Sequence, residues 1–400
     1  MTVQGLTLDQ LGSVSRGRSR HRPRNAEFLY GGPYPFVQTG EVKKSGLYLR
    51  DFDQTYSEAG LAQSKLWPAG TLCITIAANI AETAILDIEA CFPDSVIGFT
   101  ADPSKADVRF VKYLFDAVLK MQFRSFTQGA AQDNLSQEKL LSIRFPVPEL
   151  RVQKRIADTL STYDDLIENN QRRIALLEEA ARLLYREWFV HLRFPGHEHA
   201  RITDGLPEGW EWLPASEAFE VNPKTPRDDD GLIRYVPMAA LSETGMLIDR
   251  RPVEKREKST SVRFRNGDTL FARITPCLEN GKTGYLQFLA GDEVACGSTE
   301  FIVLRGRRVS NYFVYLTARQ HDFRENAIRS MIGSSGRQRV QPSCFDRYIV
   351  PIPPRVLGTL FDEAVAGMFA QIANLDQQNQ KLAQARDLLL PRLMNGEIAV

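Results

Sequence analysis

The chain has few cysteines, and they show no pattern associated with metal binding or disulfide formation. Five cysteines are scattered over 400 residues, and no two are spaced C-x-x-C. An odd, dispersed set argues against a disulfide framework and against a structural zinc site. We therefore expect free, mostly buried thiols and no bound metal. The five are Cys73, Cys91, Cys277, Cys296 and Cys344.

Long apolar runs are also missing. No eighteen consecutive residues are apolar, so a membrane span is not expected. The first residues, MTVQGLTLDQ, lack the basic and apolar regions of a secretory signal peptide. The sequence therefore predicts a cytoplasmic protein without a membrane partner.

The chain has almost no excess of charge of either sign. Lys and Arg number 50 and Asp and Glu number 49, which gives a net charge of +1. Net charge alone neither supports nor excludes a nucleic-acid partner, because the distribution of charge decides this. One segment, SRGRSRHRPR, does concentrate positive charge. It places Arg16, Arg18, Arg20, Arg22 and Arg24 within nine residues.

Catalytic motifs are absent as well. Gly281-Lys282-Thr283 resembles the end of a phosphate-binding loop, but Pro276 occupies the position where that motif needs glycine. Asn222-Pro223 is not followed by the Pro-aromatic pair used by amino-methyltransferases, and no G-x-G-x-x-G fingerprint occurs. No acidic triad with a lysine indicates a nuclease. We therefore expect a non-catalytic chain that holds no cofactor of its own.

An internal repeat is the main feature that the sequence does contain. Displacing the chain by 205 residues aligns a long block without gaps, so that Pro146 matches Pro351 and Pro148 matches Pro353. In each copy this Pro-x-Pro pair is followed by a long helical pattern, which is consistent with proline being tolerated only in the first turn of a helix. The repeat predicts the same strand, proline pair and long helix twice.

The two helical patterns carry matching heptad seams, which predicts that they can pack on each other. Arg386 is the one clear mismatch, since Ala181 holds the equivalent seam position in the first copy. The first seam is Ile156, Tyr163, Asn170, Leu177, Leu184 with Leu160, Ile167, Ile174, Ala181, Trp188, and the second is Phe361, Met368, Leu375, Leu382, Leu389 with Val365, Ile372, Asn379, Arg386, Leu393.

Each seam contains one asparagine, and this suggests how the register is fixed. An antiparallel pairing that opposes Asn170 and Asn379 also opposes Ile174 and Leu375. A buried Asn pair specifies register at some cost in stability. The alternative is that both asparagines lie at the solvated edge of the seam.

The remaining segments alternate short β-rich runs with turns and then a helical run, which indicates two globular α+β domains. The expected fold class is α+β: two globular domains, each followed by a long helix, related by an internal pseudo-two-fold repeat. The expected boundaries are residues 1–147 for the first domain, 148–190 for the central spacer helix, 191–204 for a linker, 205–352 for the second domain and 353–396 for the distal spacer helix. His197 and His199 fall in the linker, where a solvated segment is favoured over a metal site.

The order of several motifs resembles the specificity subunit of type I restriction-modification enzymes. These motifs are YGGPYPFVQTGEV, the stretch from Leu135 to Trp188, REWFVHLRFPGHE, LPEGWEW and GSSGRQRV. The resemblance covers almost the whole chain, and the stretch from Leu135 to Trp188 is its most specific part. It implies that the two domains are target-recognition domains, each reading half of a bipartite site on double-stranded DNA. It also implies that the two long helices form an antiparallel coiled coil that acts as a spacer.

The resemblance also implies partners and cofactors. Two methyltransferase subunits carrying S-adenosylmethionine would dock to form an adenine-N6 methylase, and two restriction subunits using ATP and Mg would complete the complex. The outer helix faces, with mixed charges, are candidate docking surfaces, although a solvated face is the simpler reading. These faces were expected to carry Arg155, Asp158, Arg172, Glu178 and Arg182.

The polar loop before each Pro-x-Pro strand is the leading candidate for DNA contact, because Arg suits guanine, amides suit adenine and Ser suits phosphate. A solvated turn is the alternative reading of these loops. The arginine-rich N-terminal segment is likewise either a phosphate contact or a solvated loop. The candidates are Gln128, Gln132 and Asn134 in the first loop, Ser334, Ser335, Arg337, Gln338 and Arg339 in the second, Arg273, Thr275 and Lys282 in a neighbouring segment, and Arg16, Arg18 and Arg20.

The sequence is also compatible with two other functions. One is a coiled-coil scaffold that does not bind DNA, which a gel-shift with random duplexes would identify. The other is a detached recognition module of a fused restriction-methylation enzyme, whose partner would carry both nuclease and methylase motifs. The sequence does not specify the half-site letters or the gap between them.

Overall fold

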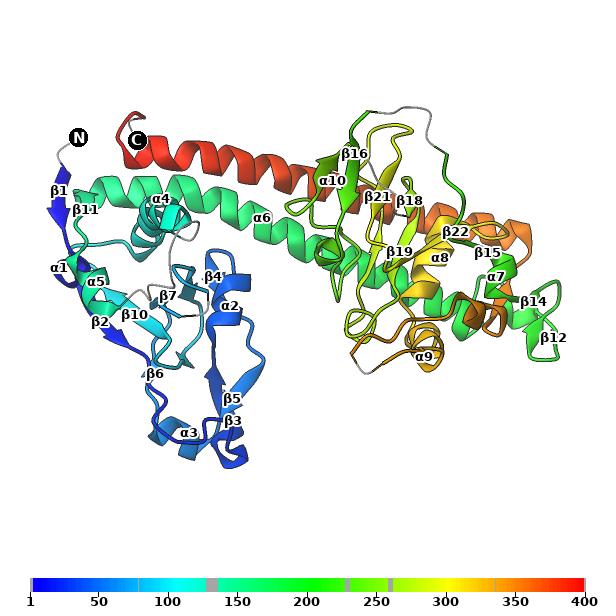
Figure 1. Ribbon diagram of the computed structural model, residues 1–400, viewed down its shortest axis with the longest axis horizontal. Helices are drawn as coiled ribbons and strands as arrows, with labels where there is room; N and C mark the ends of the chain where they lie inside the picture. The colour runs from blue at the N-terminus through cyan, green and yellow to red at the C-terminus, as the bar shows by residue number, and fades with distance from the viewer. Residues whose placement is uncertain are drawn as a thin grey trace. The chain divides into compact units, whose positions relative to one another are not determined.

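The computed structural model describes residues 3–77, 79–126, 136–226, 231–257, 262–334 and 336–398. These residues form two compact units (Figure 1). Unit 1 comprises Met1–Asn169 and Gln378–Val400, and unit 2 comprises Asn170–Gln377. The C-terminal segment therefore belongs to the same unit as the N-terminal half of the chain.

Unit 1 contains two sheets and a separate strand pair. The five-stranded sheet has the order β2 (Gly12–Arg16), β10 (Val96–Ala101), β7 (Leu72–Thr75), β8 (Thr83–Leu86), β4 (Tyr48–Leu49). The four-stranded sheet has the order β5 (Gln54–Tyr56), β3 (Tyr30–Phe36), β9 (Ala90–Cys91), β6 (Leu66–Trp67), and β1 (Val3–Leu6) pairs with β11 (Phe145–Pro148). The helices are α1 (Leu8–Leu11), α2 (Thr39–Lys44), α3 (Glu58–Ala62), α4 (Val108–Phe126), α5 (Gln137–Ser142) and the first part of α6 (Leu150–Tyr185).

Unit 2 contains two four-stranded sheets and two strand pairs. The first sheet has the order β15 (Phe219–Val221), β22 (Phe301–Gly306), β19 (Thr269–Ala272), β20 (Thr283–Tyr285). The second has the order β17 (Glu254–Arg256), β16 (Ile233–Val236), β21 (Ala295–Gly297), β18 (Arg263–Phe264). The pairs are β14 (Glu211–Pro214) with β23 (Ile349–Ile352) and β12 (Ile202–Thr203) with β13 (Leu206–Pro207), and the helices include α7 (Ala215–Ala218), α8 (Asn311–Ala318), α9 (His321–Arg329) and most of α10 (Arg355–Met394).

The two units repeat the same strand order, which confirms the duplication predicted from the sequence. The order β2-β10-β7-β8 in unit 1 corresponds to β15-β22-β19-β20 in unit 2, and β5-β3-β9-β6 corresponds to β17-β16-β21-β18. In the sheet β5-β3-β9-β6 of unit 1 and in the sheet β17-β16-β21-β18 of unit 2, the two central strands are parallel. The pair β1–β11 likewise corresponds to β14–β23, so each Pro-x-Pro segment ends a strand that closes its own unit.

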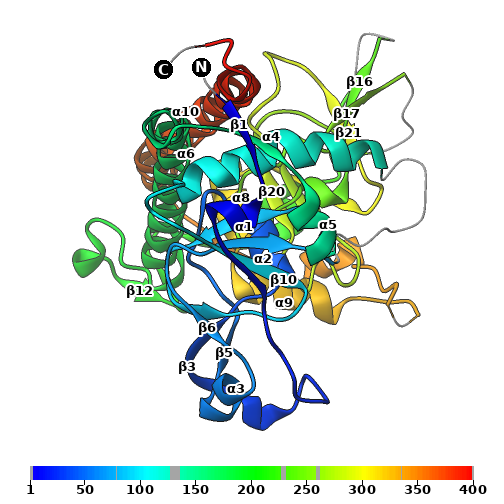
Figure 2. The same cartoon turned by 90° about the vertical axis from the view of Figure 1, so that its left-hand side faces the viewer.

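Side chains alternate along the central strands of the sheet β15-β22-β19-β20, so both faces of this sheet are apolar. In β22, Ile302 and Leu304 face the core that includes the long helices, whereas Phe301 and Val303 face the core beneath the second sheet. In unit 1, α4 packs on the five-stranded sheet in the same core as the start of α6 (Figure 1, Figure 2). Each unit is therefore a layered structure in which one sheet lies between helices and a second sheet.

Inside each unit the two long helices run antiparallel. In unit 1, Ile156 near the start of α6 shares a core with Leu393 near the end of α10. In unit 2, Tyr185 at the end of α6 shares a core with Phe361 near the start of α10. The predicted antiparallel pairing of the two helices is therefore present in the structure.

The seam positions are buried only in part, because each helix contacts its unit as well as the other helix. Phe369 is buried in unit 2 among Tyr285, Tyr312 and Tyr315, whereas the predicted seam residue Met368 is half-buried. On α6, Ala157 is fully buried outside the predicted seam. A helix with two neighbours needs a wider apolar stripe than a coiled-coil seam provides.

Helix α10 contains an 18-residue window of mean hydropathy 1.3, which by length and composition alone would suffice to cross a membrane. Only 22% of that window is buried, so much apolar surface of α10 faces outward. Its inner face, including Val365 and Ile372, belongs to the core of unit 2. Helix α10 therefore packs into the core with one face and leaves its other face exposed.

Arg386, the mismatch in the predicted seam, has a partner that explains it. Its guanidinium pairs with Asp164 of α6 and with Asp387. Asp164 also accepts a hydrogen bond from the buried hydroxyl of Tyr113 on α4, whose pKa is raised mainly by burial. The charge therefore links both long helices to α4 inside unit 1.

The prediction that Glu178 and Arg182 lie on the outer face of α6 is wrong. Glu178 is 5% exposed and accepts hydrogen bonds from the Tyr315 hydroxyl at 2.6 Å and the Met246 N–H at 2.8 Å. Arg182 pairs with Glu178 and donates to the Thr244 carbonyl at 2.8 Å. A buried carboxylate needs such partners, so these residues join α6 to unit 2 rather than to an external protein.

A second buried ion pair ties the sheet of unit 2 together. The guanidinium of Arg305 on β22 donates two hydrogen bonds, each 2.7 Å long, to the carboxylate of Asp268. Arg305 also donates to the Thr225 hydroxyl at 3.0 Å, and Asp268 is fully buried. Asp268 holds the pKa of Arg305 above its ordinary value.

We expect Asp268→Ala to lower the free energy of unfolding by about 3–5 kcal/mol, because it leaves the Arg305 guanidinium buried without its partner. Urea denaturation of the full chain, followed by far-UV circular dichroism, measures this change. Arg251→Ala is the matched control, since the Arg251 side chain is 90% exposed in its pair with Asp249 and should change stability by less than about 1 kcal/mol. Equal losses in the two variants would contradict the assignment.

Candidate nucleic-acid interface

Two loops that the sequence singled out separately lie together in unit 2. The segment from Arg273 to Lys282, which follows β19, is hydrogen-bonded to the segment from Ile332 to Val340. The Thr275 N–H donates to the Gln338 carbonyl at 3.1 Å, and the Val340 N–H donates to the Arg273 carbonyl at 2.8 Å. The Thr275 hydroxyl in turn accepts from the Gln338 N–H at 3.2 Å. The first loop therefore supports the second.

The second loop is a short hairpin. Ile332 and Arg339 exchange two backbone hydrogen bonds of 3.1 and 3.0 Å, and the Arg337 N–H closes a turn on the Ser334 carbonyl at 3.0 Å. Gly333 has a φ of +136°, and a Cβ there would lie 3.0 Å from the Arg337 carbonyl oxygen. A side chain at this position would strain the turn, so the glycine is required by the hairpin geometry.

The cationic side chains of these loops differ in how they are held. Arg339 forms a bidentate pair with Glu300, with N–O distances of 2.7–3.0 Å, and this pairing raises the pKa of Arg339. Arg273 donates to the Val340 carbonyl at 3.3 Å, and Lys282 to the Met238 carbonyl at 3.5 Å. Arg337 is exposed, and no described residue hydrogen-bonds to its guanidinium.

This difference divides the candidate residues by what they can do. Thr275 is 8% exposed and its polar groups bond to the hairpin, so it positions the loop. A contact from Arg339 to a base would require its pair with Glu300 to open. Ser334 and Arg337 are exposed on the turn itself and are directly available to a ligand. As DNA contacts, all of these residues remain predictions.

Sequence reasoning did not identify the residues that brace the loops. Glu300 fixes Arg339, and Arg319 donates to the Gly281 carbonyl at 2.9 Å, with burial lowering the pKa of its guanidinium. Both lie far along the chain from the residues they hold. No motif or spacing in the sequence links them, although an acidic residue beside the buried strand β22 was a possible signal for an ion pair.

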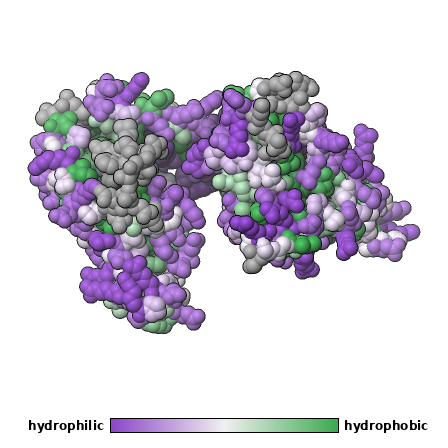
Figure 3. Space-filling view, in the orientation of Figure 1, coloured by the Kyte–Doolittle hydropathy of each residue, from purple (hydrophilic) through white to green (hydrophobic). Residues whose placement is uncertain are grey.

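In unit 1, the arginine-rich segment is partly structural. Arg16 donates to the Asp94 carbonyl at 2.8 and 3.0 Å, and Arg24 forms an ion pair with the Asp94 carboxylate at 2.9 Å. Arg18 and Arg20 are exposed, and no side-chain hydrogen bond joins them to the described residues. Hydrophilic residues gather at the end of unit 1 that carries β3, β5 and α3 (Figure 3).

Arg18 lies close to another cation, Lys65. Burial and, second, the charge of Arg18 lower the pKa of the Lys65 amine. The Lys65 Nζ also lies 3.5 Å from the ring centroid of Trp67. This proximity makes a small positive patch of Arg18 and Lys65, and Arg20 lies two residues along the chain from Arg18. Such a patch is the kind of surface that meets phosphates.

The remaining candidates are only partly described. Gln128, Gln132, Asn134 and Ser335 lie outside the described residues. Asn170 is buried and Asn379 half-buried, so the hypothesis that they set the helix register stays a prediction. All five cysteines are free thiols, and no group of three or more His, Cys, Asp or Glu side chains within the described ranges is placed to hold a metal ion.

The comparisons with known proteins agree on one family. Residues 3–179 match the family described as "Type I restriction modification DNA specificity domain". The EcoEI type I specificity subunit of Escherichia coli is 34% identical over 164 residues, which cover 38% of this chain and only 27% of that protein. The MjaIX type I specificity subunit of Methanocaldococcus jannaschii is 22% identical over 397 residues, which cover 93% of this chain and 88% of that one.

A solved structure shows the same fold. The S subunit of a type I restriction-modification system from M. genitalium aligns over 98% of this chain and 96% of its own, with a TM-score of 0.56 and 15% sequence identity. The relatives are named specificity subunits rather than methyltransferases or endonucleases, in agreement with the predicted non-catalytic role. Residues 3–179 therefore match the type I specificity domain, and over 93% of its length the chain is similar to a type I specificity subunit.

Proposed function

We propose that this chain reads a bipartite site on double-stranded DNA, with one half-site recognised by each unit and the gap set by the paired helices. The observation that carries this proposal is the repetition of one strand order in two units that share two long helices. A protein with two similar reading surfaces is suited to a target with two separate parts. The cytoplasm is the compartment in which such a protein meets its DNA.

In this proposal the loops of each unit make the contacts. In unit 2, Arg337 and Ser334 project from a hairpin that Thr275 and Glu300 hold in place, which suits a side chain that must reach a groove. In unit 1, Arg18 and Arg20 with Lys65 supply phosphate contacts that add affinity without sequence preference. Bases are then distinguished by the few side chains on the hairpin.

The catalytic work in this proposal belongs to partners. Methyltransferase subunits would bring S-adenosylmethionine and modify adenine at N6, and restriction subunits would bring ATP and Mg. Apolar side chains on the exposed face of α6 and its continuation support a docking surface for a partner helix. Leu176 and Leu183 lie seven residues apart on α6 and are 70% and 49% exposed, and Val190, in the π-helical turn that continues α6, is 55% exposed. That spacing is the one a coiled-coil partner recognises.

Sequencing of modified adenines, with this chain and its methyltransferase partner co-expressed, tests the proposal directly. Inserting seven residues into both α6 and α10, where each passes between the units, preserves the heptad phase. It adds about 10 Å at roughly 1.5 Å per residue, or about three base pairs at about 3.4 Å each. We expect the same half-sites with a longer gap, whereas altered half-sites at the original gap would contradict the spacer role.

Arg337→Ala should weaken DNA binding, because it removes an exposed cation from the hairpin. If Arg337 contacts a phosphate, the slope of log K against log salt falls by about 0.9, and if it reads guanine, discrimination at one base pair falls by about 1–3 kcal/mol. Fluorescence anisotropy at several salt concentrations measures both effects. Arg251→Ala, another exposed arginine of unit 2, is the control, and an unchanged affinity for Arg337→Ala would remove this residue from the interface.

Replacing Leu176 and Leu183 together by serine should reduce co-purification of the methyltransferase subunit, because it removes exposed apolar area that the partner would cover. The melting temperature of the isolated chain should change little, since neither side chain is buried. Leu232→Ser, at another exposed leucine of unit 2, serves as the control. Undiminished co-purification would show that the partner docks elsewhere.

A further inference from the structure

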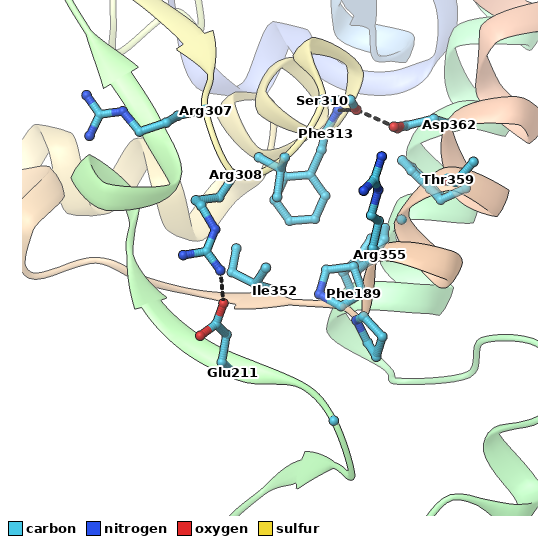
Figure 4. A pocket seen from close by; sticks show the side chains of 16 residues that line it. Phe189, Glu211, Arg307, Arg308, Ser310, Phe313, Ile352, Arg355, Thr359 and Asp362 are labelled. Carbon is cyan, nitrogen blue, oxygen red and sulfur yellow. Dashed lines mark hydrogen bonds and ion pairs between the residues drawn. The ribbon is translucent and has the colours of Figure 1, made fainter.

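Unit 2 contains a cavity of about 600 Å³ beside the start of α10 (Figure 4). Its apolar walls include Phe189, Phe313 and Ile352. Arg355 enters from the first turn of α10, Arg308 from the loop after β22 turns toward Glu211, and Arg307 from the same loop points away from the other lining side chains. A concave site of this size with apolar walls and a few polar groups is typical of a binding pocket.

The equivalent place in unit 1 is filled by the chain itself. Gln153, the fourth residue of α6, is 1% exposed there. Its amide oxygen accepts from the Asp107 N–H at 3.1 Å, and its amide nitrogen donates to the Lys105 and Pro148 carbonyls at 3.0 and 2.9 Å. Asp107 directly precedes α4, so Gln153 joins the start of α6 to the start of α4.

Unit 2 has a glycine at the position where unit 1 has the buried Gln153. The displacement of 205 residues places Gly358, the fourth residue of α10, at the position of Gln153. A Cβ on Gly358 would meet only Pro353 Cγ, at 3.8 Å, so there is room for a side chain. The cavity is therefore a site that the repeat fills in one copy and leaves open in the other.

The cavity of unit 2 is lined by more cationic than anionic side chains. Arg308 pairs with Glu211, and Asp362 accepts a hydrogen bond from the Ser310 hydroxyl. Within the described ranges, no hydrogen bond or ion pair engages the guanidinium of Arg307 or Arg355. Arg355, beside the aromatic side chains of Phe189 and Phe313, is suited to a carboxylate on a ligand that also carries an apolar group.

We propose that this cavity receives an acidic segment of the methyltransferase partner, with an apolar side chain against the phenylalanines and a carboxylate at Arg355. This inference rests on the proposed function and adds to it a site on the chain. A phosphate of DNA fits the charge but not the aromatic walls. The first turns of α10 lead out of the cavity with Val356 79% exposed and Leu360 42% exposed, so an apolar path connects it to the helix surface.

Gly358→Gln tests the inference, because it should close the cavity in the way that Gln153 does in unit 1. The full chain, native or variant, is titrated with the purified methyltransferase subunit by isothermal calorimetry. We expect Kd to rise about tenfold or more, since truncating or blocking a buried charge contact raises dissociation strongly. Gly40→Gln is the matched control: it introduces the same side chain into helix α2, where a Cβ meets nothing within 4 Å, and should leave Kd within about twofold.

A second variant keeps the cavity open and removes the charge of Arg355. Arg355→Ala should weaken binding comparably, and the Arg355 side chain has no partner to lose among the described residues. A photoreactive p-benzoyl-phenylalanine at Thr359, which lines the cavity, should crosslink to a methyltransferase peptide that contains Asp or Glu.

The outcomes separate this inference from the proposed function. Unchanged affinity in both the Gly358→Gln and the Arg355→Ala variants, with the methyltransferase still bound by the native chain, would overturn the pocket and leave the proposed function intact. A crosslink to DNA, or to a peptide without acidic residues, would overturn the assigned ligand. A native chain that binds no methyltransferase would overturn both.

Discussion

The burial of α6 and α10 is the constraint on which the rest of the structure depends. Each unit contributes sheets and a short helix, but its main core closes only when segments of both long helices pack into it. The chain satisfies this requirement with an antiparallel pair, so that the start of one helix meets the end of the other within each unit. Apolar burial of this kind is the dominant favourable contribution to folding. It also explains why charged groups on the inner faces, such as Glu178 and Arg386, have buried partners.

The sequence predicted the duplication, the paired long helices and the α+β class, because apolar periodicity and repeated prolines are local patterns. The antiparallel direction of the helices was implied by the family resemblance. The sequence predicted the buried surface of the helices less well. Phe369 lies outside the heptad seam and is buried because α8 and β20 pack against it, which no local pattern reports. Glu178 was placed on the outer face for the same reason, since its partners Tyr315 and Met246 come from distant parts of the chain.

The candidate DNA interface was likewise predictable only where the sequence signal is local. Polar loops with glycine were recognisable as candidates, and two of them lie together in unit 2 as one braced structure. Which cation is available could not be predicted, because availability depends on distant acids. Glu300 holds Arg339, and the Asp94 carbonyl holds Arg16, whereas Arg337, Arg18 and Arg20 have no such partner among the described residues. The polar composition of a loop can be read from the local sequence. Which of its side chains is free to bind a ligand depends on contacts with distant parts of the chain.

The return of the C-terminal part of α10 to unit 1 has a consequence for biosynthesis. Leu393 is 2% exposed in a core with Leu8, Phe110 and Ile156, which leave the ribosome hundreds of residues earlier. Unit 1 therefore cannot complete this core until the end of α10 has been synthesised, which comes after the whole of unit 2.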